Sequence, residues 1–233
     1  MISMKKVTTV ILAAGKSTRF KGSKSKLEQE LAGLPIICHV VNAAKKISGN
    51  DVIIVCNKNN IKNLKLLIND CKFVIQKNQK GTADAINSVK RLIKQKHLLI
   101  LFGDVPLISI QTIKKLIFNF RQNRSLASMV AFNSSNPHGY GRLLLKKNKV
   151  FKVVEEINAN QDEKKITICN SGIMLVDSNI FFKNLNSIKI NKVKKEKYLP
   201  DIFEIYSKKQ IPFSLIISPE NEMLGVNTLS DFL

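Results

Sequence analysis

Small residues and basic residues meet near the start of the chain. The stretch Val7 to Lys26 (VTTVILAAGKSTRFKGSKSK) passes from an apolar run into Ala13, Ala14 and Gly15, and then into a basic loop. Small residues let backbone N–H groups approach an anion closely, and the basic side chains that follow can balance its charge. The stretch therefore predicts a phosphate-binding turn. A basic turn that is simply solvated is the alternative.

The turn matches neither of the two common glycine-rich phosphate motifs. A Walker-type P-loop needs a glycine five residues before its Gly-Lys pair, and that position is Val10, inside the apolar run. The dinucleotide fingerprint G-x-G-x-x-G fails because Ser17 and Phe20 occupy its second and third glycine positions. What remains is an anion-binding turn at the end of a strand, without the P-loop wrap.

The elements that must position this turn alternate between strands and helices. Apolar runs predict strands at Val7–Leu12, Asp51–Cys56, Phe73–Gln76 and Leu98–Phe102. Helical spacing and start signals predict helices over Pro35–Ile47, Asn60–Asn69, Thr82–Gln95 and Ser109–Arg121. This alternation predicts an α/β fold with a doubly wound, mostly parallel, Rossmann-like sheet that is covered on both faces.

The pattern changes after Ser125. Strands are predicted at Ser128–Phe132, Arg142–Leu145, Val150–Glu155, Ile173–Val176 and Phe213–Ile217, with Lys146–Lys149 as a hairpin turn and a helix near Asp201–Lys208. Because these strands follow one another more closely, the second half is predicted to form a mixed lobe beside the parallel sheet. The 233 residues suit a single domain.

Composition limits the classes of partner and compartment. The net charge of +21 raises the hypothesis of nucleic-acid binding, but the charge is spread along the chain and lacks interleaved aromatic residues where it is densest, at Lys189–Lys197. A higher local concentration of small polyanionic substrates is the simpler interpretation. The four cysteines lie in apolar segments, which predicts buried, reduced thiols and a cytoplasmic protein. The apolar run at Val7–Ala14 is too short for a signal peptide, and no later segment predicts a membrane span.

Ordered motifs along nearly the whole chain resemble one family. LAAGKSTRF…SKSKLEQELAGLPIICHV is similar to the nucleotidyltransferase signature, and it is followed by QKNQKGTADAI, LFGDVPLIS, NPHGYGRL, VVEEINA, CNSGIML, EKYLPDIF and LGVNT. Together they resemble the N-terminal uridylyltransferase domain of bifunctional N-acetylglucosamine-1-phosphate uridylyltransferases. The resemblance implies transfer of uridylyl from UTP to N-acetylglucosamine-1-phosphate, giving UDP-N-acetylglucosamine and pyrophosphate for cell-envelope amino-sugar biosynthesis.

The resemblance assigns the nucleotide side to a half of about residues 5–125. It implies that Leu12, Ala13, Ala14 and Gly15 form the backbone cradle for the nucleotide. Arg19 and Lys26 match the family's basic catalytic pair, which would stabilise charge on the triphosphate. Gln76, Gly81 and Thr82 match the residues that bind the uracil base; a polar strand end and a helix N-cap at Thr82 are the alternative.

The resemblance implies one divalent metal ion, held by two residues that are distant in sequence. Asp104 ends the segment LLILFGD, at the carboxyl edge of the predicted parallel sheet, where ligands bind. Mg²⁺ prefers such oxygen ligands, although an aspartate at a strand end is also often a helix cap. The resemblance pairs Asp104 with Asn227 of LGVNT as the ligands of Mg²⁺.

The sugar is assigned to a half of about residues 126–227. Gly141 of HGYGR, Glu155 of VVEE and Asn170 of CNSG match positions that contact N-acetylglucosamine, and carboxylate and carboxamide groups suit its hydroxyl and amide groups. Tyr198 and Asp201 resemble the family's Y-x-x-D segment. The family's acetyltransferase β-helix would follow Asn227, where this chain has only TLSDFL, so acetyltransferase activity is not expected of it and the oligomeric state stays open.

Several positions depart from the family pattern. Ser17 replaces a glycine, Ser25 a proline before Lys26, and Leu224 a glutamate; His138 and Pro200 replace threonines. The loss of proline at Ser25 is expected to loosen the loop that carries Lys26. Three alternatives therefore stay open: a related nucleotidyltransferase with another sugar phosphate or NTP, a catalytically weakened sensor of UDP-sugar, and a non-catalytic nucleic-acid-binding protein.

Overall fold

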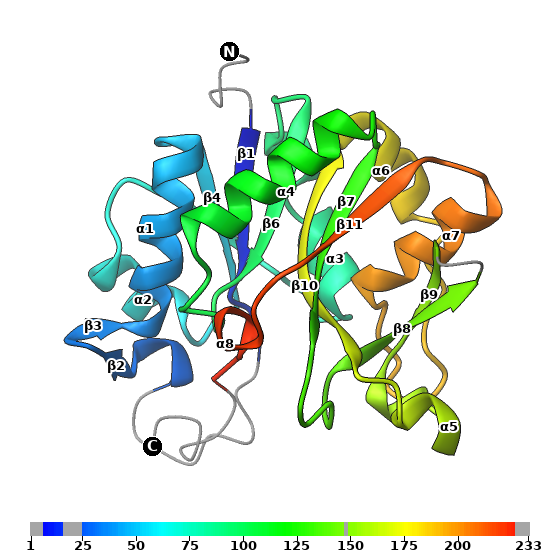
Figure 1. The fold of residues 1–233 in the computed structure, drawn as a ribbon. Coiled ribbons are helices and arrows are strands. Elements are labelled where there is room, and N and C mark those ends of the chain that lie inside the picture. Colours follow the sequence, from blue (N-terminus) through cyan, green and yellow to red (C-terminus); the bar gives the residue numbers. More distant parts are fainter. Residues whose placement is uncertain (1–6, 16–24, 147–148, 227–233) are drawn as a thin grey trace.

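A central sheet organises the chain (Figure 1). The computed structural model describes residues 7–15, 25–146 and 149–226. Seven strands follow one path through the sheet, in the order β11-β7-β10-β6-β1-β4-β5. The strands β1 (Val7–Leu12), β4 (Val52–Cys56), β5 (Lys72–Ile75) and β6 (His97–Phe102) are all parallel. The predicted α/β fold with a mostly parallel sheet is confirmed.

One strand of the main path runs the other way. β10 (Ile168–Asp177) is antiparallel to β6 on one side and to β7 (Ala127–Asn133) on the other, whereas β11 (Phe213–Ile217) is parallel to β7. The sequence predicts only the second part of β10, Ile173–Val176. A register irregularity between Asn170 and Met174 divides the strand, and the first part pairs with a different neighbour.

The mixed lobe of the second half grows from β10. β8 (Gly141–Lys146) pairs with the start of β10 and with β9 (Lys149–Val154), as the predicted hairpin requires. The lobe therefore lies beside the carboxyl edge of the parallel strands, where β8 and β9 are seen at the lower right of Figure 1.

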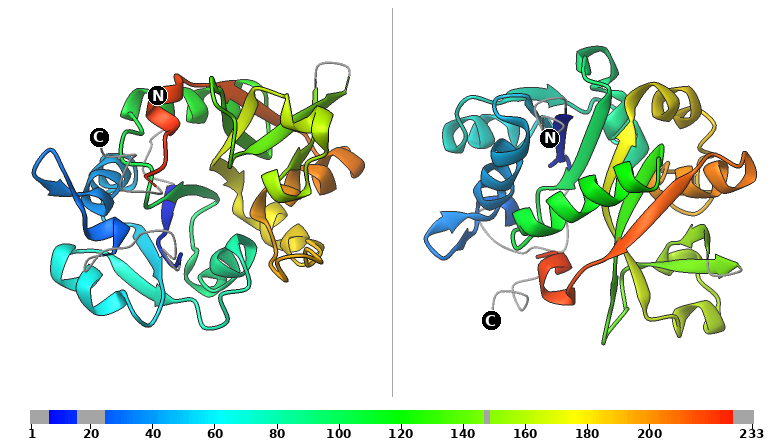
Figure 2. Two further views of the ribbon diagram at one scale, coloured as in Figure 1. Left: turned by 90° about the horizontal axis from the view of Figure 1, so that it is seen from below. Right: turned by 45° about the horizontal axis from the view of Figure 1, so that its top comes forward.

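Helices cover both faces of the sheet, as Figure 2 shows from two further directions. Residues of α1 (Ile36–Ser48), α2 (Ile61–Leu67) and α4 (Ile110–Gln122) share one buried apolar cluster with the sheet. Residues of α3 (Thr82–Asn87), α6 (Ser178–Leu185) and α7 (Ile202–Lys208) share the cluster on the opposite face. The short elements are β2 (Glu30–Leu31), β3 (Leu34–Pro35), α5 (Gln161–Lys164) and α8 (Glu220–Met223).

The predicted helix over Thr82–Gln95 is too long. α3 ends at Asn87, and a 3₁₀ turn follows at Lys90–Leu92. Ser88 Oγ donates to the Ala85 carbonyl at 2.6 Å, and such local side-chain bonds compete with the helical pattern. The apolar spacing that suggested a longer helix belongs to this turn instead.

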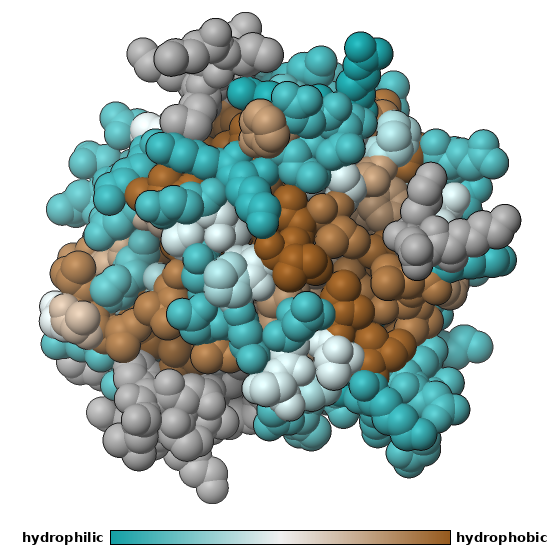
Figure 3. All heavy atoms as spheres, viewed as in Figure 1, coloured by the Kyte–Doolittle hydropathy of each residue, from teal (hydrophilic) through white to brown (hydrophobic). Residues whose placement is uncertain are grey.

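Two cysteines are less buried than their apolar segments suggest. All four are free thiols; Cys56 and Cys169 are buried, but Cys38 and Cys71 are partly exposed. Apolar side chains also stay visible on the face that α4 and β11 cross (Figure 3), where Phe118 is 64% and Ile217 38% exposed. Among the helices of residues 7–15, 25–146 and 149–226, none has the length and apolar character needed to cross a membrane.

Candidate functional site

The end of β1 is held by hydrogen bonds to its carbonyl groups. Leu12 O accepts from Gly103 N at 2.9 Å, just after the end of β6. Ala13 O accepts from Asn60 Nδ2 at 2.7 Å, and Ala14 O accepts from Asn57 Nδ2 at 3.2 Å. The carbonyls of the turn thus face the neighbouring elements, β6 and the β4–α2 connection.

Asn57 and Asn60 are functional candidates that sequence reasoning missed. Both are buried, and they fix each other: Asn57 Oδ1 accepts from Asn60 N at 3.0 Å, and Asn60 Oδ1 accepts from Asn57 N at 2.9 Å. With the carbonyls so occupied, the N–H groups of Ala14 and Gly15 have no hydrogen-bond partner among the described residues. They are available to an anion, which is the arrangement that the small-residue turn predicts.

Asp104 and Lys26 form an ion pair beside this turn. Asp104 follows β6 by two residues, and Phe102 at the end of β6 pairs with Leu12 at the end of β1. The pair is partly shielded, with 14% of the Lys26 side chain and 21% of the Asp104 side chain exposed. The structure therefore brings together Lys26, Asp104 and the β1 turn, three features that the sequence analysis singled out separately.

The backbone before Lys26 is restrained although Ser25 stands where the family has a proline. Its φ of −65° lies in the range that proline would impose. Its Oγ donates to Glu28 Oε1 at 2.7 Å, and Glu28 Oε2 accepts from Asn63 Nδ2 at 3.1 Å. These bonds tie the Lys26 turn to α2, and they replace part of the rigidity expected from proline.

Three predicted positions fall outside the described residues: Arg19, Ser17 and Asn227. The neighbour of Asn227 is informative, because Val226 N donates to the Asp104 carbonyl at 2.9 Å. The residue directly before Asn227, more than 100 residues away along the chain, thus contacts the backbone of Asp104.

The predicted base-binding residues lie together where α3 begins. Gln76 is buried at the end of β5, and its Nε2 donates to Gly81 O at 2.9 Å and to Asp84 Oδ2 at 2.8 Å. Thr82 is not the N-cap of α3, as the alternative interpretation proposes; Gly81 has that position. Thr82 Oγ1 instead accepts from Leu199 N at 2.9 Å, because the chain after residue 191 packs against this turn.

Gly81 is required by the backbone that crosses it. Its φ is +95°, and a Cβ there would lie 2.5 Å from the Lys197 carbonyl oxygen. Lys197 O accepts from Ala83 N at 3.1 Å, and Lys197 N donates to Lys80 O at 2.8 Å. The approach of the Lys197 backbone therefore demands a glycine at this position, whether or not a base binds beside it.

The predicted sugar residues are also neighbours. Gly141 of β8 pairs with Asn170 of β10, and Glu155 Oε1 lies 3.4 Å from where a Cβ of Gly141 would stand. Asn170 is buried, and its Oδ1 accepts from Gly172 N at 3.1 Å, within the irregular part of β10. Three residues that are distant in sequence thus meet in one place.

Burial shifts the acidity of the carboxyl groups near this lobe. Loss of solvation raises the pKa of Glu155 to about 7, with a further increase from the charge of Asp201. Loss of solvation and the charge of Glu204 raise the pKa of Asp201 to about 6, against a lowering effect of Lys152. Glu155, Asp201 and Tyr198 line a cavity of about 280 Å³. Near neutral pH this cavity holds carboxyl groups that change charge easily.

Asp104 lines a different and larger cavity of about 940 Å³. Its walls come from the residues after β6, from the β7–β8 loop including His138 and Tyr140, and from α8 and the residues up to Val226. Glu155, Asn170 and Gln76 are not among the described residues that line it, although Ser171 is. Of the predicted site residues, Asp104 thus lines the large cavity and Glu155 lines the small one.

Arg142 orders the β7–β8 loop, which lines the large cavity. Its side chain is 2% exposed and forms an ion pair with Glu156, and it also donates to the Tyr140 carbonyl. Glu156 Oε2 accepts in addition from Gly139 N at 3.3 Å. A buried, paired arginine explains why this loop, which carries Gly141, has one defined course.

The oxygen ligands present suit a magnesium ion. Within the described part of the chain, no three His, Cys, Asp or Glu side chains gather as a metal cluster. Mg²⁺ does not require one, because it is commonly held by one or two protein ligands together with substrate phosphates and waters. Asp104 offers a partly exposed carboxylate at the wall of the large cavity, which fits this mode.

Comparison with known proteins identifies the family of the chain. Residues 9–170 match the family model described as the MobA-like NTP transferase domain. The chain belongs to this family.

Relatives with curated names have a common description. The chain is 38% identical over 227 residues to the "Bifunctional protein GlmU" of Buchnera aphidicola subsp. Schizaphis graminum, covering 96% of this chain and 49% of that protein. It is 35% identical over 229 residues to the protein of the same name from Campylobacter fetus subsp. fetus, covering 96% of this chain and 51% of that protein. The chain thus spans about half the length of these relatives.

A solved structure supports the fold. A putative glucose-1-phosphate thymidylyltransferase from Bacillus anthracis, in complex with a sucrose, superposes with a TM-score of 0.72 at 17% identity. The match covers 91% of this chain and 87% of that one. The similarity confirms the predicted α/β fold.

Proposed function

We propose that the protein transfers uridylyl from UTP to N-acetylglucosamine-1-phosphate, releasing pyrophosphate and giving UDP-N-acetylglucosamine. The observation that carries this proposal is the Lys26–Asp104 ion pair beside the β1 turn, where the N–H groups of Ala14 and Gly15 have no hydrogen-bond partner among the described residues. A cation, an oxygen ligand for a metal and an anion-binding turn at one sheet edge are the parts that transfer between phosphates requires. The relatives named GlmU support the choice of this reaction within the family.

The nucleotide binds at the β1 turn in this proposal. The N–H groups of Ala14 and Gly15 donate to the phosphates, and Leu12 and Ala13 fix the turn through their carbonyls. Gln76, Gly81 and Thr82 hold the uracil: the Nε2 of Gln76 is already engaged, so its Oε1 is the group left to accept from the base. Arg19, outside the described residues, adds positive charge to the same phosphates.

The reaction needs alignment and charge balance rather than a protein nucleophile. The phosphate of the sugar attacks the α-phosphorus of UTP in line with departing pyrophosphate, and Lys26 balances the charge that develops on the transferred and leaving groups. Asp104, with Asn227, would hold Mg²⁺. When bound, the ion neutralises phosphate charge and helps to align the reacting groups.

The sugar is recognised by the lobe of the second half. Gly141 leaves room beside Glu155, and Asn170 presents its amide from the irregular part of β10. With a pKa of about 7, the Glu155 carboxyl can donate to a sugar hydroxyl when protonated and accept from one when ionised. Because its pKa is raised to about 7, Glu155 is the main candidate for contacts with N-acetylglucosamine.

A substrate panel tests this proposal. Pyrophosphate release is measured for UTP, TTP, CTP and ATP, each with N-acetylglucosamine-1-phosphate, glucosamine-1-phosphate and glucose-1-phosphate. We expect the highest kcat/KM for UTP with N-acetylglucosamine-1-phosphate. A clear preference for another pair would assign the chain to a related nucleotidyltransferase, and binding of UDP-N-acetylglucosamine without turnover would identify a sensor.

The net charge of +21 is the reason to test one function of another class, nucleic-acid binding. Binding to DNA and RNA is measured over a range of salt concentrations beside the pyrophosphate assay. A steep dependence on salt together with no pyrophosphate release would favour nucleic-acid binding. Turnover without such binding supports the enzyme.

A further inference from the structure

A glutamate at the start of α8 joins two distant segments. The Glu220 carboxylate accepts from Ser134 Oγ at 2.7 Å and from Ser135 N at 3.0 Å, both through Oε1, and Ser135 Oγ lies 3.2 Å from Oε2. We call Glu220 with Ser134 and Ser135 the α8 clamp. Hydrogen bonds to a charged acceptor are stronger than neutral ones, so the clamp is a firm link between α8 and the β7–β8 loop.

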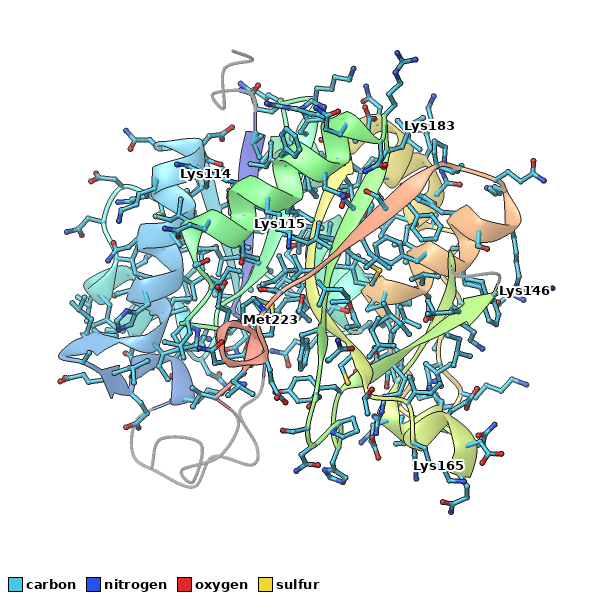
Figure 4. All side chains as sticks on the ribbon, viewed as in Figure 1. Lys114, Lys115, Lys146, Lys165, Lys183 and Met223 are labelled. Carbon is cyan, nitrogen blue, oxygen red and sulfur yellow. The ribbon has the colours of Figure 1, made fainter. Side chains whose placement is uncertain are left out.

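The other side of α8 leads to Asp104. Glu222 Oε2 accepts from Ser109 N at the start of α4 at 3.1 Å, and Met223 is buried, with 1% of its surface exposed. Figure 4 labels Met223 on α8, close to the lower edge of the sheet. Three residues later, Val226 N donates to Asp104 O at 2.9 Å. A continuous path of contacts thus runs from the β7–β8 loop through α8 to Asp104.

The large cavity lies between the parts that this path connects. Ser135, His138 and Tyr140 line it from the β7–β8 loop, and Asp104 lines it from the opposite half. Glu220 and Val226 belong to the wall between them. The length and rigidity of this wall therefore set the separation of the loop from Asp104.

We propose that Glu220 is a positioning residue: through the α8 clamp it holds the β7–β8 loop at a fixed place relative to Asp104, and so sets how the sugar phosphate meets the nucleotide. The inference rests on the proposed function, in which Asp104 holds the metal ion and the β7–β8 loop leads into Gly141 on the sugar side. It adds a residue that none of the family-matching motifs contains.

Amide exchange in the ligand-free protein tests the clamp directly. In Glu220→Gln, we expect the amides of residues 224–226 to exchange roughly tenfold faster, the effect of losing about one charge-assisted hydrogen bond. Ser134→Ala should act in the same direction. The double variant should add little to Glu220→Gln, because both changes act on the bond between Ser134 and Glu220, whereas Ser134→Ala alone leaves the bonds from Ser135 in place. Asp162→Asn, which removes an exposed pair with Lys165 beside α5, is the matched control.

Kinetics separate a positioning role from a merely structural one. In Glu220→Gln, the KM for the sugar phosphate should rise about tenfold while the KM for UTP stays near that of the unchanged protein. Unchanged exchange at residues 224–226 would overturn the inference, and so would faster exchange with an unchanged KM for the sugar phosphate. If the unchanged protein releases no pyrophosphate from any pair of the panel, the proposed function fails, and the exchange measurement decides the clamp alone.

Discussion

The two halves of the proposed site, the nucleotide side and the sugar side, are built from different chemical groups. On the nucleotide side, the β1 turn presents main-chain N–H groups, and buried side-chain amides of Asn57 and Asn60 hold its carbonyls. On the sugar side, Glu155 presents its side chain, in surroundings that raise its pKa. The first half therefore depends on backbone geometry and the second on the protonation of side chains.

The two halves should therefore respond differently to a change of pH and to mutation. Backbone groups have no titratable state, so the nucleotide side should be insensitive to pH but intolerant of any change that moves the turn. Side-chain carboxyls near neutral pKa should make the sugar side sensitive to pH and tolerant of small shifts. The following variants test that contrast.

The largest effect is expected from Lys26→Ala. The variant removes the cation beside the anion-binding turn, and kcat should fall roughly 100-fold or more, as for other preorganised charges at phosphoryl groups. Pyrophosphate release measures it. Lys165→Ala is the matched control, since Lys165 pairs with Asp162 on the surface of α5, distant from Lys26. A rate in Lys26→Ala close to that of the control would remove Lys26 from the mechanism.

Gly81→Ala tests the dependence on backbone geometry. Positive φ costs about 1–3 kcal/mol for a side-chain residue, and the contact with Lys197 adds to that cost, so the free energy of unfolding should fall by about 3 kcal/mol or more. Denaturant unfolding measures it. Gly33→Ala is the control, because Gly33 also has a positive φ of +79° but open space around it. Equal losses in the two variants would show that the approach of Lys197 does not matter.

Glu155→Gln is expected to have the smallest effect on folding stability, and that effect should depend on pH. The raised pKa of Glu155, about 7 instead of 4.5, means that its contribution to stability is present below pH 4.5 and is lost as pH rises to about 7. The glutamine variant lacks this loss. Its melting temperature should therefore rise relative to that of the unchanged protein as the pH increases from 5 to 7. Parallel profiles would place Glu155 in a solvated, unshifted environment.

The sequence predicted the parallel half of the fold well, for a physical reason. Strands buried on both faces, such as β1 and β6, are continuous apolar runs that few other structures allow. The antiparallel direction of β10 could not be predicted in this way, because an apolar strand has the same composition in either direction. The two-residue strands β2 and β3 are too short to show any period.

Site prediction divided along a similar line. The motifs around Asp104 and Lys26 identified residues that the structure places in contact, but only the fold shows that they pair. Asn57, Asn60 and Glu220 act through bonds to segments distant in sequence, so neither local spacing nor composition could identify them. The clue at Asn57 was modest: an asparagine directly after a buried strand.

Magnesium-dependent pyrophosphate release by the unchanged protein and by Asp104→Asn tests the central claim most directly. Asparagine keeps the shape of the side chain but removes the charge that would hold the ion. With UTP and N-acetylglucosamine-1-phosphate, we predict release that needs Mg²⁺ in the unchanged protein and is lost in the folded variant. Release that continues in excess chelator, or a variant with the same rate and magnesium dependence as the unchanged protein, would contradict the account.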